Sequence, residues 1–268
     1  MEPYASDFVL TVAFALGVVR SLFKNIQLFP KQLAANFIFT CIDKPYNTTM
    51  KKIFYLLFIL IAFNTQQSDA QNKPAFWDNI QRFKKMDSLH KPAKNGIVFV
   101  GSSSFTKWTD LENVYKTYGA INRGFGGSTL AQANDYIADV VYPYEARQVV
   151  IYSGENDIAI DQTSALETLN RFAAFFTRIR IKHPKTAVLY ISMKMSPSRM
   201  QYAETILHAN ALIKDYLSSY SNTKFVDVNS KMLKNGQPRP ELFLKDQLHM
   251  KQAGYDIWIK EITPHLLK

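Results

Sequence analysis

Three consecutive serines follow an apolar stretch of the chain, and their hydroxyl groups could act as nucleophiles. Residues 97–100 (Ile-Val-Phe-Val) lead into Gly101 and then into the serines at 102–104. An apolar run without alternation is typical of a strand buried on both faces, as parallel strands are. A strand, a glycine turn and a helix start would put a serine hydroxyl at the carboxyl edge of a sheet, beside free backbone N–H groups. This position suits a nucleophile or an anion site, and it also suits an ordinary helix N-cap.

A histidine near the end of the chain is the candidate for the base that a serine nucleophile needs. Of the five histidines, His249 lies in a polar loop between the last predicted strand and the last predicted helix. Asp246 precedes it by three residues, so that one turn of chain could let the carboxylate orient the imidazole. The alternative is a helix-capping aspartate beside an incidental histidine.

Three groups could donate hydrogen bonds to the oxyanion of a tetrahedral intermediate. Gly127 lies in a glycine-rich loop and offers a backbone N–H with no side chain in the way. Asn156 follows a predicted strand and offers its side-chain amide, and the Ser103 N–H at the predicted helix start is the third group. The structural alternatives are a plain turn glycine at Gly127 and an Asx-turn at Asn156.

Predicted strands and helices alternate along the chain, which favours a parallel sheet with helices on both faces. Right-handed crossovers would then bring the carboxyl ends of all strands to one edge, where the candidate residues collect. The strands are expected at residues 97–100, 117–122, 148–153, 186–193 and 224–228. The helices are expected at 76–89, 105–111, 130–141, 163–182, 201–220 and 251–266.

Two of these helices carry apolar stripes at helical spacing. The helix at 76–89 is expected to cover one side of the sheet with Phe76, Ile80, Phe83 and Met86. The helix at 163–182 is expected to bury Leu166, Leu169, Phe172, Phe176 and Ile179.

Four blocks in this order resemble those of the SGNH hydrolases, also called GDSL-type esterases. They are Gly101-Ser102-Ser103, Gly127, Gly154-Glu155-Asn156-Asp157 and Asp246-Gln247-Leu248-His249. The resemblance covers about residues 97–268 and implies a flavodoxin-like three-layer α/β/α sandwich with a five-stranded parallel sheet. One position departs from the pattern, because Ser102 stands where the namesake motif has Asp. No Gly-x-Ser-x-Gly motif is present, which argues against the nucleophile elbow of the α/β-hydrolases.

The resemblance also implies a role for each matching residue. Ser103 would be the nucleophile, His249 the general base and Asp246 the residue that orients it. Gly127 and Asn156 would donate to the oxyanion together with the Ser103 N–H. Ser102 and Ser104 flank the implied nucleophile and are the alternative candidates for that role.

The expected reaction is hydrolysis of carboxylic esters, with short acyl groups on sugars or polysaccharides as the first choice of substrate. A lysophospholipase or thioesterase activity is the alternative, as is a non-catalytic carbohydrate- or lipid-binding module on the same fold. Trp108, Phe125 and Leu248 lie close to the blocks in sequence and are expected to line the substrate pocket. We expect no cofactor and no metal, and the glycine loop lacks the lysine of a phosphate-binding P-loop.

Composition limits the partners and the chemistry. A chain of 268 residues with 47% hydrophobic residues can form a substantial core. The formal net charge is +10, but basic residues are scattered among acidic ones, so no nucleic-acid partner is expected. The expected partner is a small-molecule or polysaccharide ester. Cys41 is the single cysteine, which excludes an intrachain disulfide.

Residues 50–70 have the pattern of a secretory signal peptide. Met50, Lys51 and Lys52 precede an apolar stretch at 53–63, and small residues stand at 68 and 70. This stretch is too short to cross a bilayer, which takes about 20 residues. We therefore expect export to the periplasm or the extracellular space, with no stable membrane partner after cleavage.

The position of this signal pattern bears on the residues before it. Export signals lie at the start of a protein, so Met50 is expected to be the true start. Residues 1–49 would then be a non-native extension, and a weak membrane segment at 8–19 is the alternative. The hydrolase domain is expected to span 71–268.

Overall fold

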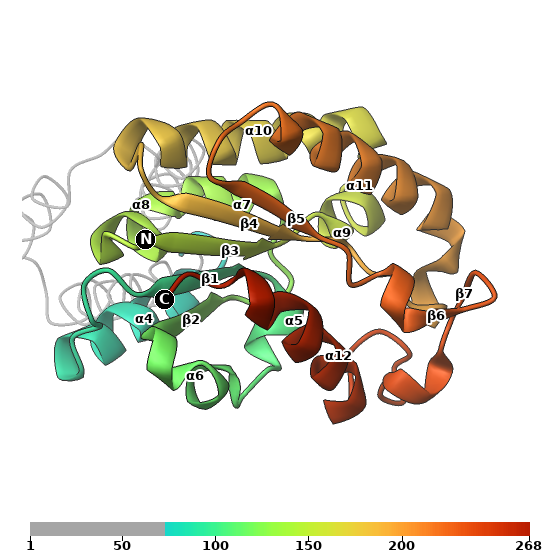
Figure 1. Cartoon of the computed structure of the whole chain (residues 1–268), viewed down its shortest axis with the longest axis horizontal. Coiled ribbons are helices and arrows are strands. Elements are labelled where there is room, and N and C mark those ends of the chain that lie inside the picture. The colour runs from blue at the N-terminus through green and yellow to red at the C-terminus, as the bar shows by residue number, and fades with distance from the viewer. Residues whose placement is uncertain (1–72) are drawn as a thin grey trace, which may run out of the picture. The chain divides into compact units, whose positions relative to one another are not determined.

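The computed structural model describes residues 73–268, and this part of the chain is built on a five-stranded parallel sheet. The strand order is β2-β1-β3-β4-β5, with every neighbouring pair parallel. This is the flavodoxin-like order, and it confirms the predicted fold class (Figure 1). The strands are β1 (Ile97–Gly101), β2 (Ala120–Gly124), β3 (Gln148–Tyr152), β4 (Ala187–Ile191) and β5 (Thr223–Val226).

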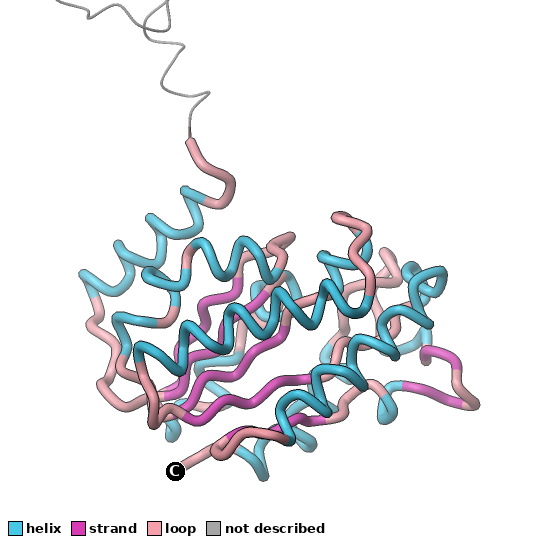
Figure 2. Tube along the Cα trace, turned by 90° about the horizontal axis from the view of Figure 1, so that it is seen from above, coloured by secondary structure: helices cyan, strands magenta, loops and turns pink. Residues whose placement is uncertain are grey.

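Helices cover both faces of the sheet (Figures 1 and 2). One layer contains α4 (Trp77–Leu89), α7 (Leu130–Asp135), α8 (Ile137–Val140), α10 (Ala165–Lys182) and α11 (Ala203–Ser218). The other contains α5 (Ser103–Thr106), α6 (Leu111–Val114) and α12 (Gln252–Ile262). The short helix α9 (Glu155–Ala159) follows β3. The remaining elements are a hairpin, β6 (Leu233–Lys234) and β7 (Gln237–Pro238), and the 3-10 helices η1 (Lys116–Tyr118), η2 (Tyr142–Tyr144), η3 (Pro197–Tyr202), η4 (Ser230–Met232), η5 (Pro240–Leu242) and η6 (Thr263–His265).

The two central strands that lead to the candidate site are buried along their whole length. All residues of β1 and β3 are buried. Val98 and Val100 of β1 face one core, and Phe99 faces the other, where Trp258 also lies. Burial of a large apolar side chain contributes about 1.5–3 kcal/mol. The strands therefore form a stable base for the loops at their carboxyl ends.

Several predicted boundaries were wrong because local backbone geometry ends regular structure earlier or later than hydropathy indicates. The helix expected at 105–111 is not continuous, since α5 ends at Thr106 and α6 begins at Leu111. The second strand begins at Ala120, since η1 and a left-handed Gly119 (φ 61°) occupy the residues before it. The helix expected at 130–141 is divided into α7 and α8 at Tyr136. The helix expected at 201–220 begins only at Ala203, after η3.

The apolar stripe of α10 differs from the expected one at its first turn. Leu166 is 59% exposed, whereas Phe175 is fully buried. At 100° per residue, Leu166 lies roughly 120° around the helix from Phe172 and so faces away from the sheet. Ala165 occupies the buried position in that turn. In α4, Met86 was likewise expected to be buried and is 44% exposed.

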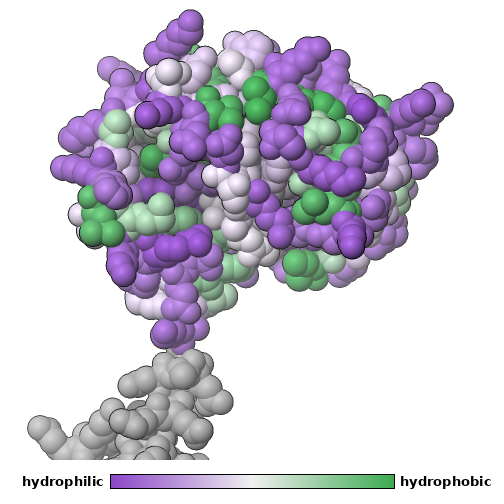
Figure 3. Space-filling view, turned by 90° about the horizontal axis from the view of Figure 1, so that it is seen from below, coloured by the Kyte–Doolittle hydropathy of each residue, from purple (hydrophilic) through white to green (hydrophobic). Residues whose placement is uncertain are grey.

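The extension at 1–49 and the signal peptide at 50–70 lie outside the described residues. Within residues 73–268, no helix has the length and apolar character that membrane crossing requires. On the face drawn in Figure 3, hydrophobic residues form separate small groups among hydrophilic ones. Scattered groups of this kind are normal on an exposed protein surface and do not mark a docking site.

Candidate active site

The carboxyl ends of β1 and β3 lie where the strand order reverses. From β1 the chain passes to β2 on one side, while β3 pairs with β1 on the other. In open parallel sheets such a point leaves a crevice between neighbouring loops, and ligands bind there. Because β1 ends two residues before Ser103 and β3 ends shortly before Asn156, both residues come to this crevice.

Ser103 is the first residue of α5, directly after the turn that ends β1. Ser102 occupies the N-cap with an extended backbone, and its N–H donates to the carbonyl of Tyr152 at 3.2 Å. Ser102 and Ser104 are 7% and 3% exposed, whereas Ser103 is only half-buried. Ser103 is therefore the most accessible of the three serines, as a nucleophile must be. Its role stays a prediction.

The glycine-rich loop after β2 packs against the serine turn. The Phe125 N–H donates to the Gly101 carbonyl at 2.9 Å, which ties the loop to the end of β1. A Cβ atom added at Gly126 would lie 3.6 Å from the Cβ of Ser103. Gly127 has a φ of 89°, in the left-handed region that favours glycine. The loop thus lies beside Ser103, and donation by the Gly127 N–H to an oxyanion stays a prediction.

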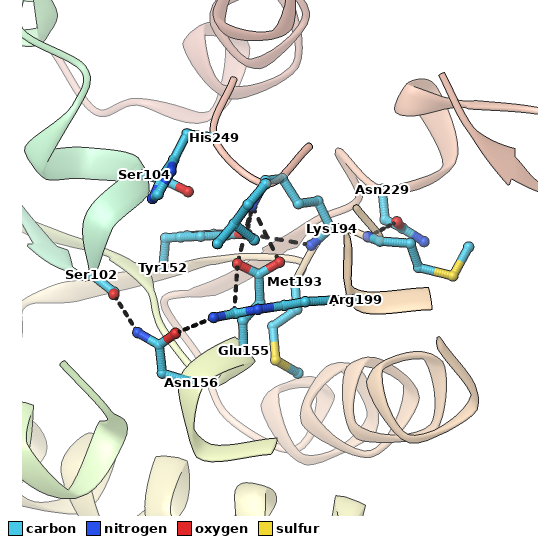
Figure 4. Close-up of polar contacts among 12 residues, drawn as sticks. Ser102, Ser104, Tyr152, Glu155, Asn156, Met193, Lys194, Arg199, Asn229 and His249 are labelled. Atoms are coloured by element: carbon cyan, nitrogen blue, oxygen red, sulfur yellow. Dashed lines mark hydrogen bonds and ion pairs between the residues drawn. The ribbon is translucent and has the colours of Figure 1, made fainter. Parts of the chain in front are cut away.

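Asn156, the second residue of α9, connects three segments through its buried side-chain amide. Figure 4 shows its contacts with Ser102 and Arg199. Nδ2 donates to the Oγ of Ser102 at 2.7 Å and to the carbonyl of Ser128 at 2.9 Å. Oδ1 accepts a hydrogen bond from Nη2 of Arg199 at 2.8 Å. The amide therefore presents its donor side to the serine turn and the glycine loop.

Asp246 and His249 form a tight pair in the loop before α12. His249 Nδ1 lies 2.6 Å from Asp246 Oδ2, and Asp246 Oδ1 accepts the backbone N–H groups of Leu248 and His249 at 3.0 and 2.9 Å. Partial burial raises the pKa of Asp246, but these hydrogen bonds outweigh it, so the pKa lies well below its usual range. An ionised Asp246 accepts a hydrogen bond from the Nδ1–H group, which leaves Nε2 of the ring to act as a base. A left-handed Gln247 (φ 54°) permits this tight turn.

Two contacts bring this loop to the crevice. The Ser198 N–H of η3 donates to the Gln247 carbonyl at 3.1 Å. The Tyr255 hydroxyl of α12 donates to the Ser104 carbonyl at 2.9 Å. Within the part of the chain that the structure describes, no hydrogen bond joins Ser103 Oγ to His249.

A buried ion pair beneath the site was missed from the sequence. Lys194 Nζ lies 3.2 and 3.0 Å from the two carboxylate oxygens of Glu155 and 3.3 Å from the Tyr152 hydroxyl. Burial lowers the pKa of Lys194, and the Glu155 carboxylate opposes that shift. The sequence signal was a glutamate beside Asn156 and a lysine shortly after a buried strand. Among residues 73–268 no group of three or more His, Cys, Asp or Glu side chains could hold a metal ion.

Asp157 holds the start of α9 in place through two contacts of its buried side chain. Its carboxylate accepts the Leu130 N–H at 2.9 Å and pairs with Arg171 at 3.0 Å. Burial raises the pKa of Asp157, while these two partners lower it. The contacts tie α9 to the start of α7 and to α10.

The residues expected to line the substrate pocket occupy different environments. Trp108 is 2% exposed and stacks on Tyr255 with ring centroids 5.0 Å apart. Phe125 is fully buried in the opposite core, and Leu248 is half-buried. The first two rings therefore lie within the packed layers on the two sides of the sheet. Contact of any of the three with a substrate stays a prediction.

Comparisons with known proteins agree with this architecture. A GDSL-like lipase from Bacteroides thetaiotaomicron superposes with a TM-score of 0.62 at 23% identity, over 70% of this chain and 97% of that one. A protein described as a candidate acylhydrolase from Bacteroides fragilis gives 0.62 at 24% identity, over 71% and 96%. A family 3 carbohydrate esterase from Clostridium thermocellum gives 0.51 at 16% identity, over 65% and 98%. No curated protein sequence matches the chain.

The structural likenesses, all below 25% identity, show the shared fold. The family comparison goes further, because the GDSL-like lipase/acylhydrolase family matches residues 98–257, more than half of the chain. This range contains the serine turn, the glycine loop, Asn156 and the Asp246–His249 pair. The chain therefore belongs to the GDSL-like lipase/acylhydrolase family.

Proposed function

We propose that this protein is an exported serine esterase in which Ser103 is the nucleophile and His249 the general base. The observation that supports this most strongly is the 2.6 Å contact between His249 Nδ1 and Asp246 Oδ2. It orients the imidazole and leaves Nε2 to accept a proton. A protein that only binds a ligand does not need this pair together with an accessible serine at a helix start.

The proposed reaction has two halves. Ser103 Oγ attacks the ester carbonyl while its proton passes to His249 Nε2, and Asp246 stabilises the imidazolium. The oxyanion accepts hydrogen bonds from the N–H groups of Ser103 and Gly127 and from Asn156 Nδ2. For this, Nδ2 would exchange one of its two present acceptors, the Ser102 hydroxyl or the Ser128 carbonyl, for the oxyanion. The alcohol leaves with the proton from His249. Water then attacks the acyl-serine with the same base, which releases the acid and restores Ser103.

The proposed substrates carry short acyl groups on sugars or polysaccharides. The connections at the site are short: β1 ends at Gly101 and α5 begins at Ser103, while β3 ends at Tyr152 and α9 begins at Glu155. Short connections supply little chain for a deep acyl tunnel. The likeness to a carbohydrate esterase supports the same choice. A lysophospholipase or thioesterase activity is the second candidate.

The proposed location is outside the cytoplasm, and it rests on the sequence pattern at 50–70. The proposed partner is the ester substrate itself, with no nucleic acid and no stable membrane partner. Export can be tested by fractionating cells that express the protein and determining the N-terminal residue of the mature form. Cleavage after Ala70 is expected, and an uncleaved cytoplasmic protein would contradict the proposal.

The assay for the proposed activity is hydrolysis of p-nitrophenyl esters from acetate to laurate. Turnover should fall steeply as the acyl chain lengthens. Ser103→Ala removes the nucleophile and His249→Ala removes the general base. Each variant should therefore abolish turnover without unfolding the protein. Ser104→Ala is the matched control, since Ser104 is buried, and it should retain activity.

Three other outcomes have distinct meanings. Turnover that survives in Ser103→Ala would move the nucleophile to Ser102 or Ser104. A preference for laurate would favour the lysophospholipase or thioesterase activity. No turnover together with no labelling by a fluorophosphonate probe would favour a non-catalytic carbohydrate- or lipid-binding module.

A further inference from the structure

Arg199 reaches the candidate oxyanion amide from a segment that the family motifs do not include. Its Nη2 donates to Oδ1 of Asn156 at 2.8 Å (Figure 4). Its side chain is 14% exposed. The backbone at Arg199 is non-helical inside η3 (φ −122°, ψ 21°), and the Arg199 N–H donates to the Ser196 carbonyl at 2.9 Å. The kinked η3 segment thus holds the guanidinium beside the oxygen atom of the Asn156 amide.

Arg199 contacts the Asn156 amide more closely than it contacts the carboxylate beside it. Glu155 is the nearby carboxylate, and Lys194 already pairs with both of its oxygens at 3.2 and 3.0 Å. Arg199 Nη1 lies 4.0 Å from Glu155, further than its contact with the neutral Asn156 amide. Two cations therefore face the Glu155 carboxylate, and the negative charge of Asp246 also acts on Lys194 by raising its pKa.

The chemistry of the guanidinium determines how it acts on Asn156. A guanidinium only donates hydrogen bonds, so it requires the amide oxygen on its side and Nδ2 on the side of the serine turn. A charge-assisted hydrogen bond to Oδ1 also polarises the amide and makes Nδ2 a stronger donor. Both effects become more favourable as negative charge develops on the substrate oxygen, so they lower the barrier more than they strengthen substrate binding.

We propose that Arg199 is a positioning residue of the oxyanion hole: through Oδ1 of Asn156 it orients and polarises the amide that donates to the serine turn and the glycine loop. The Lys194–Glu155 pair supports it by satisfying the carboxylate that would otherwise hold the guanidinium. This inference rests on the proposed esterase function of the same site.

A double-mutant cycle tests the proposal on ester turnover. Arg199→Gln should lower kcat by roughly ten- to a hundredfold with little change in KM, as expected for one charge-assisted hydrogen bond. Asn156→Ala should lower kcat by about 10²–10³. If Arg199 acts through Asn156, the double variant should be no slower than Asn156→Ala alone. Losses that multiply, or a raised KM with unchanged kcat, would overturn the proposal.

Two further variants test whether the effect of Arg199 depends on its charge and whether it is specific to this site. Arg199→Lys keeps the positive charge but replaces the planar guanidinium with an ammonium group. It should recover part of the kcat that Arg199→Gln loses. Arg239→Gln is the matched control, because Arg239 pairs with Glu241 at the surface, and it should behave as the unchanged protein. Failure of Arg199→Lys to exceed Arg199→Gln would contradict the contribution of charge.

A spectroscopic readout keeps this test independent of the proposed activity. The side-chain amide signals of Asn156, assigned by their loss in Asn156→Ala, should shift in Arg199→Gln and not in Arg239→Gln. If these signals stay in place, the positioning role is wrong even when the protein is an active esterase. If they shift while Ser103→Ala retains full turnover, the proposed nucleophile is wrong and the Arg199 contact stands.

Discussion

At the scale of residues, the acid and base of the candidate site are assembled within one turn of chain. The carboxylate of Asp246 holds the His249 ring with one oxygen and two backbone N–H groups with the other. The backbone contacts fix the carboxylate before the imidazole binds it. A low pKa keeps Asp246 ionised over the working range of an esterase, so that it can stabilise a charged His249.

Replacing this carboxylate with an amide tests its role. Asp246→Asn keeps an oxygen for the backbone N–H groups, so the loop should stay folded. Its NH₂ group can donate to Nδ1, which selects the wrong tautomer, and it cannot balance an imidazolium. We expect kcat for p-nitrophenyl acetate to fall by roughly 10²–10⁴. The exposed Asp256, which accepts from Gln252, is the control as Asp256→Asn. A near-normal kcat in Asp246→Asn would mean that Asp246 does not orient the base.

At the scale of elements, the site depends on very short strand-to-helix connections. The turn after β1 brings Gly101 against the end of β3, where an added Cβ would lie 2.0 Å from the Tyr152 carbonyl oxygen. The neighbouring strand backbone cannot move away without breaking the β1–β3 ladder. Only glycine therefore lets the serine turn lie this close to β3.

This close approach predicts a difference between two glycines of the site. Gly101→Ala should lower the free energy of unfolding by about 1–3 kcal/mol or more, since the new methyl group meets backbone. Gly126→Ala is the matched control, because its Cβ would meet its nearest atoms at an ordinary 3.6 Å. Urea unfolding of both variants gives the comparison. Equal stability would show that the end of β3 can shift.

At the scale of the whole molecule, the sheet is enclosed by two cores that are rich in aromatic rings. Several tyrosines are buried in or beside these layers. Burial raises the pKa of Tyr115 to about 12, against an opposing hydrogen bond from Thr263. Burial likewise raises the pKa of Tyr144 to about 12, while Arg123 lowers it and Asp87 raises it. Both phenols are therefore more easily ionised in the unfolded chain.

These shifts predict a loss of stability in alkali. Because the folded pKa values lie above the ordinary value of 10.0, the stabilisation is complete below pH 10 and disappears as the pH rises through about 12. The free energy of unfolding in urea should fall over this interval. Tyr144→Phe, which removes one of the two phenols, should lose less stability between the same two pH values. A flat profile in the unchanged protein would contradict the buried state of these hydroxyls.

The sequence by itself determined the α/β fold class and, through four residue blocks, the family. Hydrophobic runs and helical spacing are local properties, and parallel crossovers then require the loops to meet at one edge. The serine turn, the glycine loop and Asn156 could therefore be assigned to that edge from their positions alone. The roles of Ser103 and His249 as nucleophile and base stay predictions.

Only the tertiary structure decided which distant residues touch. The Arg199–Asn156 contact and the Lys194–Glu155 pair join segments after different strands, and no periodicity links them in the sequence. The orientation of α10, which exposes Leu166 and buries Phe175, also depends on the sheet beneath it. The physical reason is the same in each case: local patterns specify elements, whereas side-chain contacts between elements depend on how those elements pack.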